Sequence, residues 1–179
     1  MKTVFHGSLT FPLKDNKLRA LSHFGDRDAA LVIIGAHLYL DSYKGTPTMY
    51  EWDMPAGSSV IVRDIGSPNE QAILRAFIER PDADAASLHC KDNFWRIKDG
   101  KHLEKLQELC GNLDIKVLEY PNAVEGGISY CSIGEVTPTK SYPVPKDEVI
   151  KAFLAIPADT WGYSPGEVAA ARAAAQDDL

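Results

Sequence analysis

Two short motifs, far apart in the chain, contain the residue types most able to do chemistry. The first is Phe5-His6-Gly7-Ser8, which follows a short β-branched run near the N-terminus. It places an imidazole beside a glycine, where a ligand can approach the backbone closely. The second runs from Tyr120 to Tyr130 and contains Glu125 followed by two glycines. Together they suggest an enzyme site in which one motif clamps a polar ligand and the carboxylate stabilises a developing cation.

Each motif also has a purely structural interpretation. The His6-Gly7-Ser8 triplet fits a strand that ends in a polar turn, with its histidine hydrogen-bonded for structural reasons. Glu125 fits an exposed turn between two strands, which is a common setting for glutamate. The sequence alone leaves both interpretations open.

A third motif, His23-Phe24-Gly25-Asp26, precedes a long apolar stretch. One interpretation is structural, with Phe24 in the core, Gly25 in a turn and Asp26 as the N-cap of a helix. The other is functional, with an imidazole and an aromatic ring at the mouth of the same cleft. A helix N-terminus beside them would favour a phosphate group.

Local signals predict the elements that must position these motifs. Periodic apolar residues, capping residues and turn residues define them. We expect strands over 3–5, 49–53, 60–62, 115–120 and 128–133, and helices over 26–40, 68–79, 101–110, 146–154 and 165–175. The helix over 68–79 follows Ser67-Pro68-Asn69-Glu70, and the helix over 165–175 follows Ser164 with Glu167; both patterns are typical of a capping box. Strands early and late with helices between them predict an α+β domain.

Composition limits the class of protein. The chain has 179 residues, of which 45% are hydrophobic and 25% charged, and a formal net charge of −6. These values predict one globular domain over residues 1–140, with a helical C-terminal extension over 141–179 packed on it. The acidic charge argues against broad binding to nucleic acids or to an anionic membrane surface, although it does not exclude a local basic groove.

Cysteine usage and targeting signals point to the cytoplasm. Cys90, Cys110 and Cys131 are odd in number and widely spaced, so we expect buried thiols in a reducing compartment. The sequence has no apolar signal segment and no apolar run long enough to span a membrane. Its histidines and cysteines form none of the usual metal-binding patterns, so no metal is expected.

Taken together, the motifs resemble the ADP-ribosyltransferase superfamily. The resemblance is to the branch of poly(ADP-ribose) polymerases and diphtheria-type toxins, in its small bacterial and phage members. The likeness spans residues 2–136. It is carried by His6-Gly7-Ser8, by His23-Phe24-Gly25-Asp26, by Tyr50-Glu51-Trp52-Asp53 and by the stretch from Tyr120 to Tyr130. It implies a split, strongly bent, mixed or antiparallel sheet with flanking helices.

The resemblance also implies an activity. An enzyme of this kind uses NAD as a substrate, cleaves the bond between nicotinamide and ribose, and transfers ADP-ribose to a macromolecule. The acceptor would be a protein, and the chain a bacterial or phage effector. By this likeness Glu125 is the catalytic carboxylate. The cofactor-binding residues would be His6 at the adenosine ribose, Gly7 at the carboxamide, Ser8 and His23 in the same pocket, and Phe24 or Tyr39 stacked on nicotinamide.

Two departures from the family pattern leave alternatives open. The branch usually carries its glutamate where this chain has Ser129, so a non-catalytic binding or inhibitor module with the same fold is the second hypothesis. If Glu125 is not catalytic, Glu135 or Glu119 takes its place. His23 stands where the branch prefers tyrosine, and a histidine pair resembles the NAD-dependent RNA 2′-phosphotransferases, which gives the third hypothesis.

Overall fold

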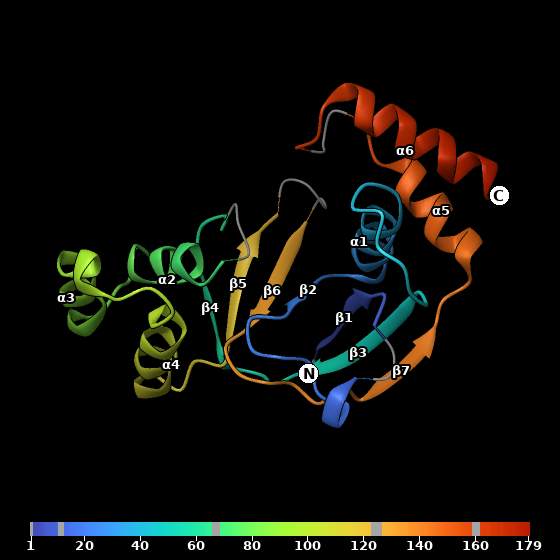
Figure 1. Ribbon diagram of the computed structural model, residues 1–179. Helices are drawn as coiled ribbons and strands as arrows, with labels where there is room; N and C mark the ends of the chain where they lie inside the picture. The colour runs from blue at the N-terminus through green and yellow to red at the C-terminus, as the bar shows by residue number, and fades with distance from the viewer. Residues whose placement is uncertain (1, 11–12, 66–68, 123–126, 159–161) are drawn as a thin grey trace.

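The computed structural model describes residues 2–10, 13–65, 69–122, 127–158 and 162–179 (Figure 1). Within these residues the chain forms two sheets flanked by helices, which confirms the α+β class. One sheet has the order β1-β3-β7, and the other has the order β2-β6-β5-β4. All neighbouring strands are antiparallel except β4 and β5. Their bounds are β1 (Lys2–Ser8), β2 (His23–Phe24), β3 (Thr48–Met54), β4 (Ser59–Ile61), β5 (Val117–Pro121), β6 (Ile128–Ser132) and β7 (Lys140–Pro143).

The two sheets meet at β1 and β2. A single bridge joins the strands, made of two backbone hydrogen bonds of 2.9 Å between Phe5 and Gly25. The ladder does not continue from this bridge to Gly7 and His23. The sheets therefore separate just where two of the sequence motifs face each other.

Helices cover the two sheets in separate groups (Figure 1). Near β1 lie α1 (Arg27–Tyr39), α5 (Lys146–Ala155) and α6 (Pro165–Asp177), and near β4 lie α2 (Glu70–Ile78), α3 (Ala85–Asp92) and α4 (His102–Asn112). Short 3₁₀ turns occupy Lys14–Asn16 and Phe94–Arg96. None of the described helices combines the length and the apolarity that a membrane crossing requires.

Helix α1 is apolar on two sides because it packs between a sheet and two helices. Ala30 and Ile34 belong to one buried cluster with Met49 of β3, whereas Val32 and Ala36 belong to another with Phe153 of α5. Asp26 caps the helix by accepting a hydrogen bond of 2.8 Å from the Ala29 N–H, as the sequence predicted. Helix α1 thereby links the C-terminal helices to β1.

Several sequence predictions are confirmed and others need correction. The capping box of Ser164 and Glu167 is present at the start of α6. Helix α2 begins at Glu70, and the Asn69 side chain caps it by accepting a hydrogen bond from the Ala72 N–H. Ser67 and Pro68 of the predicted capping box lie outside the described residues. Neither α3 nor β7 was predicted. Strand β7 pairs with β3, so the first sheet continues across the expected boundary at residue 140.

Candidate functional site at the junction of the sheets

His6 lies at the point where β1 and β2 separate. Its Nδ1 lies 2.7 Å from the backbone carbonyl of His23. A carbonyl only accepts hydrogen bonds, so Nδ1 carries the proton and donates it, and Nε2 of the neutral ring is an acceptor. Burial lowers the pKa of His6 below its ordinary value of 6.5. The site therefore presents a neutral imidazole whose tautomer is fixed by the backbone of the neighbouring strand.

His23 is a second neutral imidazole in the same place. Its Nδ1 is hydrogen-bonded to the hydroxyl of Tyr120 on β5. Burial is the largest cause that lowers the pKa of His23 to about 4, and the nearby His6 contributes further. Its Nε2 is buried and has no hydrogen-bond partner among the residues that the structure describes. Buried polar atoms nearly always have a partner, so this atom requires an explanation.

Phe24 and two further aromatic rings form the apolar wall beside His6. Phe24 is buried, and its ring centroid lies 5.7 Å from that of His6 and 5.0 Å from that of Trp52. The Tyr50 ring lies 6.3 Å from His6, opposite it in the register of β1 and β3. Phe24 thus serves both interpretations of its motif, because it is a core residue and also lines the site.

Gly7 is required by the packing of β1 on α1. A Cβ atom at this position would lie 2.2 Å from the backbone oxygen of Ala30 and 2.7 Å from the Ile34 side chain. This contact alone accounts for glycine at position 7. From the sequence, we expected this glycine to allow a ligand to approach the backbone closely. In the structure, helix α1 approaches the backbone at Gly7 closely.

The backbone of Gly7 also faces β2, at the point where the pairing of the two strands stops. Residues two apart in a strand point their N–H and C=O groups to the same edge. Phe5 directs its groups toward Gly25 on β2, so Gly7 directs its groups to the same side. In the described part of the chain, Gly7 has no paired strand residue on that side, although the residue itself is buried.

Ser8 and Tyr39 lie in different surroundings. Ser8 ends β1, and its hydroxyl accepts a hydrogen bond of 3.1 Å from the Thr10 N–H. Tyr39 is stacked on Phe153 of α5 with ring centroids 5.7 Å apart, and its hydroxyl donates to Asp178. The structure therefore brings His6, Gly7, His23 and Phe24 together but directs the Tyr39 ring toward the C-terminal helices.

The structure describes two of the three candidate carboxylates, Glu119 and Glu135. Glu125 lies outside the described residues. Glu135 is exposed and forms an ion pair of 3.0 Å with Lys17, and Glu119 lies opposite Tyr130 in the register of β5 and β6. Ser129 at the start of β6 is buried and accepts a hydrogen bond of 3.2 Å from the Asn122 side chain.

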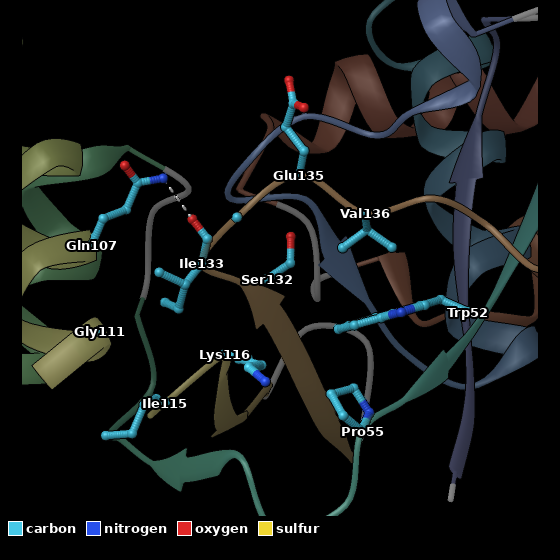
Figure 2. Close-up of a pocket in the computed structure, with 11 residues that line it drawn as sticks. Trp52, Pro55, Gln107, Gly111, Ile115, Lys116, Ser132, Ile133, Glu135 and Val136 are labelled. Atoms are coloured by element: carbon cyan, nitrogen blue, oxygen red, sulfur yellow. Dashed lines mark hydrogen bonds between the residues drawn. The ribbon is translucent and has the colours of Figure 1, made fainter. Parts of the chain in front are cut away.

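A hollow of about 290 Å³ is lined in part by Trp52, one of the rings of the aromatic wall (Figure 2). Trp52, which contacts Phe24, forms one side of it, and Lys116, Ser132 and Glu135 contribute polar groups. Gln107 donates a hydrogen bond of 3.1 Å to the Ile133 carbonyl at its rim. Neither His6 nor His23 lines this hollow. It is a neighbour of the histidine cluster, joined to it through Trp52.

The thiols are poor nucleophiles. Cys90, Cys110 and Cys131 are free and buried, as expected. Burial raises the pKa of Cys110 and of Cys131 to about 12. Among the described residues, no group of three or more histidine, cysteine, aspartate or glutamate side chains is arranged to hold a metal ion.

Sequence reasoning found both histidines of the cluster but missed two of their neighbours. Tyr120 and Trp52 each belong to one of the sequence motifs, but neither was assigned a role in the site. Their separation from His23 and Phe24 along the chain gave no local signal that they would meet. Comparisons with models of known protein families, with curated proteins and with solved structures give no match for this chain.

Proposed function

We propose that the chain binds NAD at the junction of β1 and β2 and transfers its ADP-ribose to a protein. The observation that supports this most is the buried Nε2 of His23, which has no partner beside the fixed tautomer of His6. Leaving a buried polar atom unpaired costs about 1–3 kcal/mol. A polar ligand at this point would provide the missing hydrogen bond.

The chemistry of NAD fits two neutral imidazoles. Cleavage of the bond between nicotinamide and ribose passes through a transition state that resembles an oxocarbenium ion, as in glycoside cleavage. A positively charged histidine beside the ribose would oppose that developing charge. Because burial lowers the pKa of both His6 and His23, both rings stay neutral at physiological pH. Nε2 of His6 can then accept a hydrogen bond from a hydroxyl of the adenosine ribose, which does not react.

The edge of β1 offers a second contact for the same ligand. The N–H and C=O of Gly7 match the acceptor and donor of the nicotinamide carboxamide. Gly7 is buried, and the residues that approach its Cα are Ala30 and Ile34 of α1. Phe24 faces His6 and supplies an aromatic surface next to the bound ring.

Two substitutions separate NAD binding from catalysis. His6→Ala removes a contact to a part of NAD that does not react, so we expect the KM for NAD to rise about tenfold with little change in kcat. Glu125→Gln removes the charge that would stabilise the cation, so kcat should fall about 10²- to 10³-fold with KM nearly unchanged. Steady-state release of nicotinamide measures both parameters, and His89→Ala, at an exposed position on α3, is the control.

Wild-type activity in Glu125→Gln would move the catalytic role to Glu135 or Glu119. If substitution of each of these three carboxylates left the rate unchanged, the proposed mechanism would lose its cation-stabilising group.

One observation favours a second candidate, a non-catalytic module that captures a protein. Ser129 is buried and hydrogen-bonded to Asn122, so the start of β6 carries a packed serine in place of a carboxylate. The two candidates differ in turnover. A non-catalytic module would bind NAD without releasing nicotinamide and would still retain a protein in a pull-down.

A further inference from the structure

A second histidine cluster lies at the C-terminal end of α1. Nδ1 of His37 lies 2.8 Å from one carboxylate oxygen of Asp41, and the hydroxyl of Tyr163 donates to the other at 2.5 Å. Because a carboxylate only accepts, His37 donates from Nδ1, and its Nε2 is left as the basic atom of the neutral ring. Asp41 is held from both sides, so the orientation of the imidazole is fixed.

The turn after α1 is shaped to build this cluster. Ser42 has φ = +56°, a left-handed conformation that residues with side chains rarely adopt. The chain turns back here, and the Tyr43 N–H donates a hydrogen bond of 2.8 Å to the His37 carbonyl. The Tyr43 ring then stacks on the imidazole, with centroids 5.7 Å apart and planes at 28°.

The cluster lies next to the proposed NAD site. Ala30, Ile34 and His37 share one face of α1 because they are separated by four and three residues. Ala30 and Ile34 are the residues that approach Gly7, so His37 follows one turn beyond the contact with β1. The two histidines also interact electrostatically. Burial is the largest cause that lowers the pKa of His6, and the charge of His37 lowers that pKa further.

The imidazole is accessible as well as oriented. The His37 side chain is 38% exposed, and two exposed tyrosine rings, Tyr43 and Tyr163, are its immediate neighbours. If the contact between His37 and Asp41 served only to stabilise the end of α1, no third residue would be needed. Here Tyr163 reaches Asp41 from the segment between α5 and α6, far away in the sequence.

We propose that His37, oriented by Asp41 and Tyr163, is the general base that deprotonates a hydroxyl side chain of the acceptor protein. This inference rests on the proposed NAD-dependent transfer. A carboxylate held against Nδ1 keeps the ring in the tautomer that accepts a proton at Nε2 and stabilises the resulting imidazolium. A neutral hydroxyl acceptor needs such a base, whereas an ionised carboxylate acceptor does not.

The step balances as follows. The acceptor oxygen forms a bond to the ribose C1 while the bond from C1 to the nicotinamide nitrogen breaks. Neutral nicotinamide leaves with the electron pair. The hydroxyl proton moves to Nε2 of His37 and is later released to water, and Asp41 remains ionised throughout.

His37→Gln and Asp41→Asn test the inference, with His89→Gln as the matched control on an exposed face of α3. Each protein is given labelled NAD and a bacterial lysate, and NAD binding, nicotinamide release and protein labelling are measured separately. We expect His37→Gln to bind NAD like the wild type and to lower protein labelling about 10²-fold, in the range of general-base catalysis. Asp41→Asn should lower it in the same direction while binding stays unchanged.

The pH profile distinguishes a base from a structural residue. The groups around His37 are Asp41, Tyr43, Tyr163 and His6. The hydrogen bond to Asp41 is the largest cause that raises the pKa of Tyr163 to about 12, so this tyrosine stays neutral over the assay range. A general base must be unprotonated to act, so the pH profiles of labelling should differ in shape between the wild type and His37→Gln, and profiles of the same shape would indicate a structural role.

Three results would overturn the inference. One is wild-type labelling in both variants, and another is loss of NAD binding in parallel with labelling, which would indicate a structural role. The third is a labelled product from which neutral hydroxylamine removes the label. That reagent cleaves esters of carboxylates, so the acceptor would be a carboxylate and not a hydroxyl. A wild-type protein that neither binds nor cleaves NAD would instead overturn the proposed function and this inference with it.

Discussion

At the scale of single residues, the proposed chemistry depends on imidazoles that the fold keeps neutral. His6 is fixed by a backbone carbonyl, and His23 is fixed by the Tyr120 hydroxyl. The sequence identified both histidines because each lies in a short motif beside a glycine. It could not identify Tyr120 as the partner of His23, because only the pairing of β5 with β6 and of β6 with β2 brings them together.

The neutral state of His23 predicts a pH-dependent stability. Its pKa falls from 6.5 to about 4 on folding, mainly through burial, so between these values the unfolded chain binds the proton more tightly. The free energy of unfolding is therefore unaffected by this proton above pH 6.5 and decreases as the pH falls toward 4. From the size of the shift, this decrease amounts to about 3 kcal/mol. Urea unfolding at pH 7 and at pH 4 measures it.

His23→Gln is the comparison, because glutamine has no proton to bind in this range. The stability of the wild type relative to the variant should fall by about 3 kcal/mol between pH 7 and pH 4, because only the wild type takes up this proton on unfolding. Carboxylates that titrate in the same range affect both proteins equally. A difference between the two proteins that stays constant with pH would contradict the neutral, buried state of His23.

His37 lies outside the motifs from which the sequence predicted a site. Asp41 follows it by four residues, a spacing that places the two side chains on one face of a helix. That signal was present in the sequence. Tyr163 was out of reach because the contact depends on how the segment between α5 and α6 packs on the end of α1.

At the scale of elements, the strands and helices with a clear apolar period were predicted and the others were not. Helix α3 buries only Ser87 and Cys90 and leaves Leu88 exposed, so its sequence has no apolar stripe. Strand β7 has no buried residue and owes its existence to pairing with β3. In both cases tertiary contacts, rather than local pattern, determine the element.

The contact of β1 with α1 predicts the effect of Gly7→Ala. The added Cβ would lie 2.2 Å from the Ala30 carbonyl oxygen, which is backbone and cannot rotate away. Overpacking of this kind costs about 1–3 kcal/mol. We expect the free energy of unfolding in urea to fall by that amount.

Gly111→Ala in α4 is the matched control, because a Cβ there meets nothing within 4 Å. It should leave stability unchanged or raise it, since alanine favours a helix over glycine. Equal stability of Gly7→Ala and the wild type would show that β1 and α1 do not pack as closely as described.

At the scale of the whole molecule, the site exists because two sheets are joined by a single bridge. The bridge between Phe5 and Gly25 holds β1 and β2 together, and beyond it the pairing of the two strands stops between Gly7 and His23. The sequence predicted the α+β class and the order of most elements. It could not predict where the sheets separate, because that depends on the distant pairing of β1 with β3 and of β2 with β6.

The measurement that tests the central claim most directly is a titration with NAD followed by histidine side-chain NMR. Nitrogen-15 spectra of the imidazole rings report protonation and hydrogen bonding at each ring nitrogen. If NAD binds at the junction, the Nε2 resonances of His6 and His23 should shift as NAD is added, while those of His89 stay in place. Unchanged His6 and His23 resonances at millimolar NAD would contradict the proposal that this junction is an NAD site.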